Sequence, residues 1–395
     1  MFYKKSFIFL LLITPLQFSW AEWSGSVSLE YRHFTEEPLY PNQHDGANSS
    51  IAFQPEYNHS WNNGRQLFSF IPYVREDEND EERSQADIRE LSWLTASENW
   101  ELRLGIRKVF WGVTESQHLV DIINQSDLAA NIDGEDKFGQ PMINLALIGD
   151  YGTLDLFVLP YFRERSFPGE EGRLRGLYPD VTRDAIYQSD DEEKHIDYAA
   201  RWSKSIDVWD IGLSYFNGTS RDPIINPLMD GPPIFVPYYA LIQQLGLDLQ
   251  ATVDSWLWKL EYINRDSDFG SYNAATLGLE YTWFGNAESP SDLGLVLEYL
   301  YDDRGDSAAT PFENDIFLGL RVALNDTQST DALIGFIKDL DKDTTIYSIE
   351  ASRRLGESWK LSLEARIYES NDATDANLYA IRDDDYVQME LSYYF

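Results

Sequence analysis

The chain has 395 residues, a formal net charge of −36 at pH 7, no cysteine, and 12 Trp, 24 Tyr and 21 Phe. A surface this acidic repels phosphates, so nucleic acid is excluded as a partner, and an aromatic content of 14% is too high for an acidic disordered chain. The absence of cysteine excludes disulfide frameworks, thiol nucleophiles and cysteine-based zinc sites.

The N-terminus has the pattern of a secretory signal peptide. A Lys-Lys pair precedes an apolar run over 7–13, and the small residues Ser19 and Ala21 mark a cleavage site. We predict that residues 1–21 are removed and that 22–395 form one domain. An uncleaved anchor helix is the alternative, but the apolar run is shorter than the roughly 20 residues that a spanning helix needs.

After the signal peptide, apolar and polar residues alternate with period 2, which predicts half-buried strands. We count eighteen such segments, and sixteen is the competing count. The predicted strands cover 23–35, 49–61, 66–76, 84–96, 100–112, 141–150, 153–164, 194–204, 207–218, 237–253, 256–265, 272–284, 292–302, 314–325, 330–338, 344–354, 359–369 and 384–395.

Short and long connections alternate between these strands. The segments 62–64 and 97–99 are tight turns, whereas 113–140, 165–193 and 219–236 are long. Short turns at one end and long loops at the other are typical of transmembrane barrels. Of eleven Trp after residue 21, ten lie near a short-turn end or the N-terminal start, as expected of an interfacial belt. They are Trp23, Trp61, Trp93, Trp100, Trp202, Trp209, Trp256, Trp258, Trp283 and Trp359.

The C-terminal segment places apolar residues at every second position, including Leu391, Tyr393 and Phe395. This resembles the terminal signal that the barrel-assembly machinery recognises in Gram-negative outer-membrane barrels. Together with the signal peptide and the strand pattern, it makes 22–395 resemble the porin-type outer-membrane β-barrel superfamily.

That resemblance implies an all-β fold: a transmembrane, antiparallel, up-and-down β-barrel with short periplasmic turns and long outer loops. It implies a location in the bacterial outer membrane, with outer-membrane lipid and lipopolysaccharide as partners. The implied function is passive diffusion of small hydrophilic solutes through a porin-like channel. The oligomeric state, monomer or trimer, stays open.

Charged side chains cannot face hydrocarbon without a penalty of several kcal/mol, so the strands must turn them toward an aqueous lumen. With the acids of the loop 113–140, they give the expected pore-lining set. These residues are Arg32, Arg75, Arg103, Arg107, Asp127, Asp133, Glu135, Asp136, Glu280 and Glu298. The alternative is a salt-bridged wall without a selective role.

Loop 113–140 is the third outer loop, which in porins commonly folds into the lumen as a constriction. Its segment 113–125 contains Leu119, Val120 and Ile123 among other apolar residues, which favours a short amphipathic helix that must pack on the barrel wall. An outward-packing cap is the alternative. Loop 165–193 combines arginines with an acidic run, which is typical of a solvated loop.

Catalytic and metal-binding patterns are missing from the sequence. The five histidines form no H-x-x-x-H or H-E-x-x-H pair, and there is no G-x-S-x-G motif. We therefore expect no enzyme, no cofactor and no specific metal site. An outer-membrane hydrolase and a closed barrel with partner-binding loops are the alternatives. The acidic runs 76–82, 190–193, 339–343 and 383–385 offer loose sites for Ca²⁺ or Mg²⁺.

Overall fold

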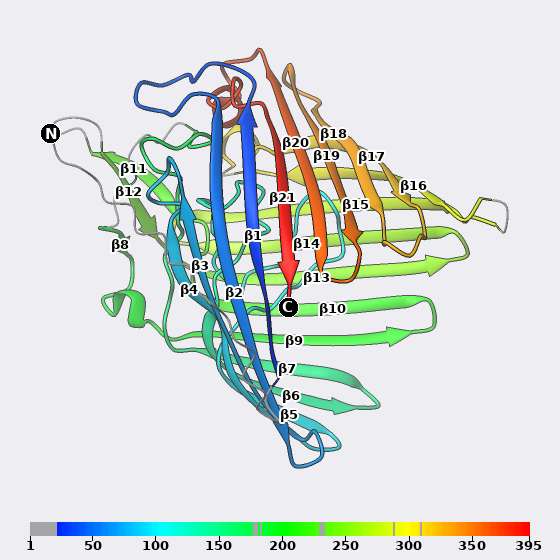
Figure 1. The fold of residues 1–395 in the computed structure, drawn as a ribbon. Coiled ribbons are helices and arrows are strands. Elements are labelled where there is room, and N and C mark those ends of the chain that lie inside the picture. Colours follow the sequence, from blue (N-terminus) through cyan, green and yellow to red (C-terminus); the bar gives the residue numbers. More distant parts are fainter. Residues whose placement is uncertain (1–21, 177–180, 182–183, 229–233, 287–288, 309) are drawn as a thin grey trace, which may run out of the picture.

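The structure is a computed structural model that describes residues 22–176, 181, 184–228, 234–286, 289–308 and 310–395. In this part of the chain, eighteen strands pair with their neighbours into one antiparallel sheet. The first strand pairs with both the second and the last, which closes the sheet into a barrel (Figure 1). The predicted count of eighteen strands is confirmed. The predicted signal peptide lies outside the described residues.

The barrel strands have the following bounds: β1 (Glu22–Phe34), β2 (Ala47–Trp61), β3 (Gln66–Asp77), β4 (Gln85–Ala96), β5 (Trp100–Arg107), β6 (Gln140–Gly149), β7 (Gly152–Leu159), β9 (Asp197–Ile206), β10 (Trp209–Thr219), β13 (Leu241–Val253), β14 (Trp256–Ser267), β15 (Gly270–Trp283), β16 (Asp292–Asp302), β17 (Asn314–Ala323), β18 (Asp331–Asp339), β19 (Thr344–Leu355), β20 (Trp359–Ser370) and β21 (Tyr386–Tyr394).

Outside the barrel, β8 (Ile186–Tyr187), β11 (Ile224–Leu228) and β12 (Ile234–Tyr239) form a small three-stranded sheet. One short helix, α1 (Ala376–Tyr379), and the single turns η1 (Glu192–Lys194) and η2 (Gly305–Ser307) lie in the connections. Among the described residues, no helix has the length and apolar character needed to cross a membrane.

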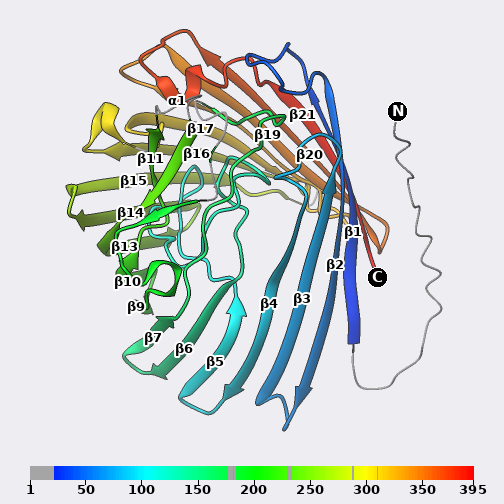
Figure 2. The ribbon, with the colours of Figure 1, turned by 90° about the vertical axis from the view of Figure 1, so that its left-hand side faces the viewer.

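Two strand boundaries differ from the prediction in an informative way. The strand predicted over 100–112 ends at Arg107, because the chain there leaves the wall (Figure 2). The strand predicted over 237–253 is divided between β12 of the small sheet and β13 of the barrel. In both cases the strand-like sequence pattern continues beyond the residue at which the chain leaves its neighbour in the sheet.

The outer face of the barrel is apolar and the inner face is polar, as period 2 requires. On β1, Leu29 and Tyr31 are exposed to the outside, whereas the alternate residues Glu30 and Arg32 are buried inside. Exposed Trp side chains gather at the ends with short turns, among them Trp23, Trp61, Trp100, Trp209, Trp256, Trp258, Trp283 and Trp359. This band of lipid-facing aromatics is the interfacial belt of a transmembrane barrel.

The short turns use residues that tolerate left-handed backbone. In the turn after β2, Asn62, Asn63 and Gly64 have φ values of 54°, 56° and 79°. Asparagine and glycine adopt this conformation at lower cost than other residues, and it matches the twist of the flanking strands.

Candidate pore and its lumen segment

The chain between β5 and β6, residues 108–139, turns into the barrel, and we call it the lumen segment (Figure 2). Its apolar side chains pack on inward-facing wall residues: Val120 and Ile123 belong to one buried cluster with Met142, Phe157 and Ile263. The helix predicted within 113–125 is wrong, because this part of the segment is irregular. Carboxylates of the wall, rather than helical carbonyls, accept hydrogen bonds from several of its backbone N–H groups.

The first of these carboxylates is Glu261 on β14, which is fully buried. Its Oε1 accepts hydrogen bonds from the backbone N–H of Val113 at 2.7 Å and of Thr114 at 3.0 Å, and from Thr114 Oγ1 at 2.7 Å. Its Oε2 accepts from the backbone N–H of Val120 at 3.2 Å. One wall carboxylate therefore fixes two turns of the lumen segment.

The second carboxylate is Glu298 on β16, which is also fully buried. It accepts the backbone N–H groups of Glu115 and Ser116, each at 2.8 Å, and the hydroxyl of Ser116 at 2.5 Å. β16 is eight strands from β5 around a barrel of eighteen. The lumen segment therefore crosses the lumen to the opposite wall.

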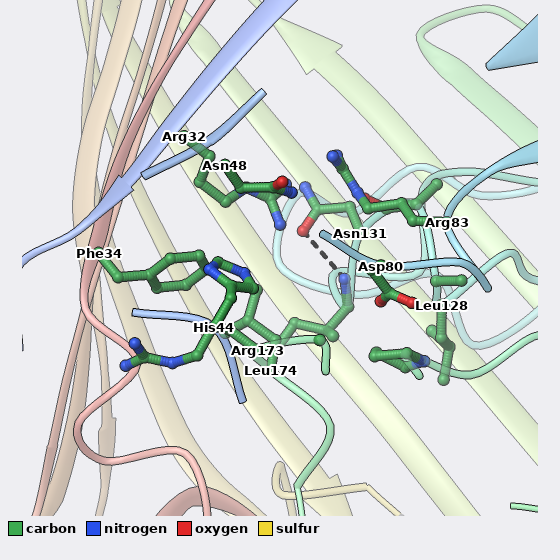
Figure 3. Close-up of a pocket in the computed structure, with 15 residues that line it drawn as sticks. Arg32, Phe34, His44, Asn48, Asp80, Arg83, Leu128, Asn131, Arg173 and Leu174 are labelled. Carbon is green, nitrogen blue, oxygen red and sulfur yellow. Dashed lines mark hydrogen bonds between the residues drawn. The ribbon is translucent and has the colours of Figure 1, made fainter. Parts of the chain in front are cut away.

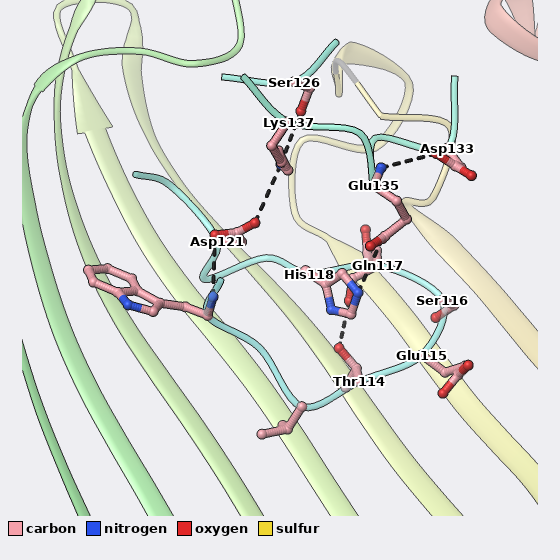
Figure 4. A network of polar contacts seen from close by, with 12 residues as sticks. Thr114, Glu115, Ser116, Gln117, His118, Asp121, Ser126, Asp133, Glu135 and Lys137 are labelled. Carbon is pink, nitrogen blue, oxygen red and sulfur yellow. Dashed lines mark hydrogen bonds and ion pairs between the residues drawn. The ribbon is translucent and has the colours of Figure 1, made fainter. Parts of the chain in front are cut away.

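A third group of contacts surrounds the tip of the segment, where His118 lies between the carboxylate of Glu135, labelled in Figure 4, and that of Glu261. Its Nε2 is 3.2 Å from Glu135 Oε1, and its Nδ1 is 3.8 Å from Glu261 Oε1. Burial lowers the pKa of His118, but the two adjacent carboxylates outweigh burial and raise the pKa to about 10. The imidazole is therefore cationic at neutral pH and holds the segment's two arms together.

Asp133 lies beside this tip, and its environment disfavours the charged form. Asp133 is exposed to the lumen. Partial desolvation inside the barrel and the neighbouring carboxylate of Glu364 on β20 raise the pKa of Asp133 to about 7. Its Oδ2 accepts a hydrogen bond from Asn131 Nδ2 at 2.9 Å, and Asn131 also donates to Glu364 Oε1 at 3.2 Å. Asp133 is thus a group of the lumen segment that titrates near neutral pH.

On the side nearest its origin, the segment is held by arginines of β4 and of the turn before it. Arg89 donates to the carbonyl of Lys137 at 2.7 Å and approaches Asp127 Oδ2 at 3.4 Å. Arg83 is buried between Glu30 and Asp77, at 2.7 Å from each, and its guanidinium also donates to the carbonyl of Ala130. Charge-assisted bonds of this kind are stronger than neutral ones.

Arg89 points inward because of a β-bulge that the alternation pattern does not reveal. Ile71 of β3 pairs with Glu90, but the next residue, Pro72, pairs with Ile88, so Arg89 has no opposite partner. Proline has no N–H to donate to the ladder, which explains the irregularity at this position. The bulge changes the inward phase of β4, and the period-2 analysis therefore missed Arg89.

The outer loops interlock above one side of the barrel. Arg173 donates to Asp384 Oδ1 at 2.5 Å and to the carbonyl of Asp383 at 2.6 Å, and both side chains of the pair are buried. The backbone N–H of His44 donates to the carbonyl of Glu171 at 2.9 Å. The expectation that loop 165–193 is solvated is therefore wrong for its first part, because it packs between the loops that follow β1 and β20.

Beneath this cap, Arg32, His44, Arg83 and Arg173 surround a cavity of about 10 Å³ (Figure 3). That volume holds about one water molecule. The cavity is therefore a hydration site inside the cap and not a solute-binding pocket.

The structure places the remaining members of the expected pore-lining set as follows. Arg32 is buried and donates to Gln388 Oε1 at 2.7 Å. Arg75 is buried beside Tyr73. Arg103 pairs with Glu101 at 2.5 Å, Arg107 donates to Asn144 Oδ1 at 3.0 Å, and Glu280 lies 3.7 Å from Arg321.

These residues are not gathered at one point. Asp127, Glu298 and Arg32 are engaged in buried contacts, and Asp136 is half-buried in the lumen segment. Side chains with substantial exposure inside the barrel are Glu135 at 55%, Glu350 at 53% and Arg321 at 39%. The inward phase of Glu261 follows from the alternation pattern, but its role in holding the segment does not. Nothing local in a sequence distinguishes a carboxylate that anchors a loop from one that faces water.

Leu391 and Tyr393 of the predicted assembly signal lie on β21, and Phe395 directly follows this strand. β21 pairs with β1 on one side and β20 on the other. Tyr393 and Phe395 are exposed on the lipid-facing surface, and Tyr393 contacts Trp359 with ring centroids 4.8 Å apart. Leu391 is half-buried on the same strand.

Comparison with known proteins gives structural likeness and no sequence relative. No protein-family model and no curated protein matches the sequence. Among solved structures, a BenF-like porin from Pseudomonas fluorescens aligns with a TM-score of 0.54 at 10% identity, over 95% of this chain and 98% of that one. OccK11 (OpdR) of Pseudomonas aeruginosa aligns with a TM-score of 0.53 at 10% identity, over 95% and 96%.

Wzi of Escherichia coli, an outer-membrane protein involved in group 1 capsule assembly and described as a carbohydrate-binding β-barrel, aligns with a TM-score of 0.55 at 11% identity, over 93% of this chain and 83% of that one. The chain thus has the porin-type fold. Its closed barrel with an apolar outer face and an aromatic belt is a bacterial outer-membrane β-barrel.

Proposed function

We propose that the protein is a channel for passive diffusion of small hydrophilic solutes, with the lumen segment as its constriction. The observation that carries this proposal is the crossing of the lumen by residues 108–139, fastened by Glu261 and Glu298 on the far wall. A segment held at both walls narrows the aqueous path to a fixed cross-section, which is how a pore selects solutes by size and charge.

The exposed charges suggest the path and its selectivity. Glu135 on the lumen segment and Glu350 on β19 are more than half exposed, and Asp133 on the lumen segment is exposed as well. The neighbouring cations are His118, Arg366 and Arg321, which pair with Glu135, Glu350 and Glu115. Because carboxylates dominate this side, we expect the channel to prefer cations.

We also propose that the barrel has no catalytic role. Nucleophilic catalysis by an imidazole needs a hydroxyl or thiol beside it. Among the described contacts, His118 meets the carboxylates of Glu135 and Glu261 and the ring of Phe110, and His195 meets Asp197 at 2.9 Å. These contacts favour structural histidines over general bases.

Planar-bilayer recording of the purified, refolded protein tests the channel. We expect discrete conductance steps, and a larger conductance when residues 116–137 are replaced by a short linker. Absence of steps from protein that migrates as a folded barrel would refute the channel. An unchanged conductance after removal of 116–137 would refute the constriction while leaving the channel standing.

A second candidate is a closed barrel whose outer loops bind carbohydrate. It is favoured by the interlocked cap, in which Arg173, Asp384 and His44 join three outer loops. Wzi, whose barrel aligns with this one, is described as carbohydrate-binding. Binding of cell-surface polysaccharide by protein that shows no conductance would support this candidate over the channel.

Two proposals concern assembly and ions. Leu391, Tyr393 and Phe395 are proposed as the signal for the barrel-assembly machinery, because the first two lie on the strand that closes the barrel and Phe395 directly follows it. Loose binding of Ca²⁺ or Mg²⁺ at the acidic outer loops is expected to be weak. Within the described residues, no group of three or more carboxylates or histidines is arranged to hold a metal ion, and Lys342 pairs with Asp306 and Glu313.

A further inference from the structure

The barrel wall has a break between β4 and β5. The two strands pair only from Leu91 to Ala96 on β4, so the six residues from Gln85 to Glu90 extend beyond the last pair. β5 ends because the chain turns into the lumen at Arg107, and Figure 2 shows β4 rising past the end of β5. Gly139 lies against the carbonyls of Ile88 and Arg89 and covers part of this edge. Backbone groups without a ladder partner are costly next to hydrocarbon, so the rest of the break must also be covered.

The break contains a cavity of about 410 Å³. Its outer lining is formed by Ile88, Ile106 and Pro141, which lie on the lipid-facing side of their strands, together with Tyr161, which is 44% exposed. Ala86 at its rim pairs with Val74, an exposed residue on the lipid-facing side of β3. The cavity therefore opens toward the bilayer and continues the apolar outer surface.

The end of the cavity nearest the outer loops is polar and carries a cation. Nη1 of Arg163 donates to Asp87 Oδ1 at 2.7 Å and to the carbonyl of Gly139 at 2.8 Å, with Phe138 beneath the guanidinium at 4.5 Å. Both bonds use the same nitrogen, and the side chain is 26% exposed. Asp87 also lines the cavity and pairs with Arg163, but its side chain is only 5% exposed, so the exposed edge of Arg163 is the charge that the cavity presents.

We propose that this cavity binds an acyl chain of an anionic membrane lipid. The hydrocarbon chain would lie over Ile88, Ile106 and Pro141, and the anionic headgroup would meet Arg163 at the outer end. The arrangement matches an amphiphile in both polarity and direction, because Arg163 follows β7 on the side of the outer loops while Ile106 lies deeper in the wall. Bound lipid would cover the unpaired part of β4 and seal the wall. This inference does not depend on channel activity.

The absence of cysteine permits a site-specific test. Ala86→Cys places one thiol at the rim of the cavity, where an attached fluorophore can be quenched by brominated acyl chains in vesicles. Leu245→Cys on β13, which is exposed to lipid and pairs with Tyr215, is the control for ordinary annular lipid. The vesicles contain a fixed fraction of brominated phosphatidylglycerol or of brominated phosphatidylcholine.

At the Ala86→Cys site we expect quenching to report an affinity about fivefold higher for the anionic lipid than for the zwitterionic lipid. This is the preference that one cation near a membrane surface supplies. At the Leu245→Cys site the two lipids should quench equally. Adding Arg163→Gln should abolish the preference, Arg163→Lys should retain it, and Ile106→Trp should fill the cavity and reduce quenching by both lipids. Arg163→Lys keeps the charge and Arg163→Gln keeps the apolar lining of the cavity. A general folding defect would therefore change quenching in both variants, whereas loss of the charge alone would change only Arg163→Gln.

Equal quenching by the two lipids at the Ala86→Cys site would overturn the proposal. So would a preference that persists in Arg163→Gln, or quenching by a free brominated fatty acid with none by either phospholipid, because a soluble alkyl carboxylate would then be the occupant.

Discussion

Replacement of Glu261 by glutamine perturbs the strongest single attachment of the lumen segment. The carboxylate accepts four hydrogen bonds, from Val113, from Thr114 twice and from Val120. A hydrogen bond to a charged acceptor contributes about 1.5–3 kcal/mol, compared with about 0.5–1.5 kcal/mol for a neutral one. Glutamine keeps one oxygen for three of these donors but presents an N–H₂ group to the N–H of Val120.

Each of the three retained hydrogen bonds therefore weakens by about 1 kcal/mol, and the unsatisfied N–H of Val120 costs a further 1–3 kcal/mol. Because neighbouring bonds are not additive, we expect a net loss of about 3 kcal/mol in the free energy that holds the segment to β14. Each 1.4 kcal/mol is a factor of ten, so the detached state becomes roughly one hundred times more populated.

Two measurements check this expectation for Glu261→Gln. Amide hydrogen exchange at Val113, Thr114 and Val120 should accelerate by about that factor, and single-channel recordings should show new, larger conductance levels. Glu390→Gln is the matched control, because Glu390 faces inward on β21 but accepts a hydrogen bond from Ser392 and none described from the lumen segment. If Glu261→Gln exchanges and conducts like Glu390→Gln, the carboxylate does not anchor the segment and the reasoning is wrong.

Three other perturbations have defined outcomes. The pKa of Asp133 is raised to about 7 from 3.8, so the folded state holds a proton that the unfolded state has lost. Stability should fall as pH rises between these values, while cation selectivity rises with a midpoint near pH 7, and Asp133→Asn should remove both effects. Arg173→Met leaves Asp384 buried without its ionic partner, which should cost about 3–5 kcal/mol of unfolding free energy in a urea titration. The double variant Arg173→Met/Asp384→Asn removes the buried charge and should lose less. Equal losses in the single and the double variant would contradict this reasoning. Reversal to glutamate at Arg103 or Arg107 should raise the cation-to-anion permeability ratio about two- to fivefold, since a charge near an ion in water contributes up to about 1 kcal/mol, and unchanged reversal potentials would show that neither residue faces the path.

The alternation pattern was sufficient to predict the barrel because the side-chain period of a strand is a local property. Each residue is either toward lipid or toward the lumen, and a charge such as Glu30 between Leu29 and Tyr31 has only one acceptable side. The short and long connections then gave the direction of the barrel. These features need no knowledge of which strands are neighbours across space.

Local patterns fail where a long-range contact changes the local geometry. The bulge at Arg89 depends on Pro72 of the neighbouring strand, and the irregular backbone of 113–125 depends on Glu261, which is 147 residues from Thr114. The apolar residues that suggested a helix are satisfied by wall contacts instead. Arg173 was expected in a solvated loop because its partner, Asp384, is 211 residues away.

The sequence by itself thus determined the barrel fold, the side of the wall that residues in regularly paired strands face and the loop long enough to enter the lumen. The tertiary structure alone decided where that loop attaches, which carboxylates are consumed in holding it and where its departure leaves the wall open. The physical reason is that alternation is set by each strand's own backbone, whereas anchoring and the break beside β4 arise from residues brought together only when the barrel closes.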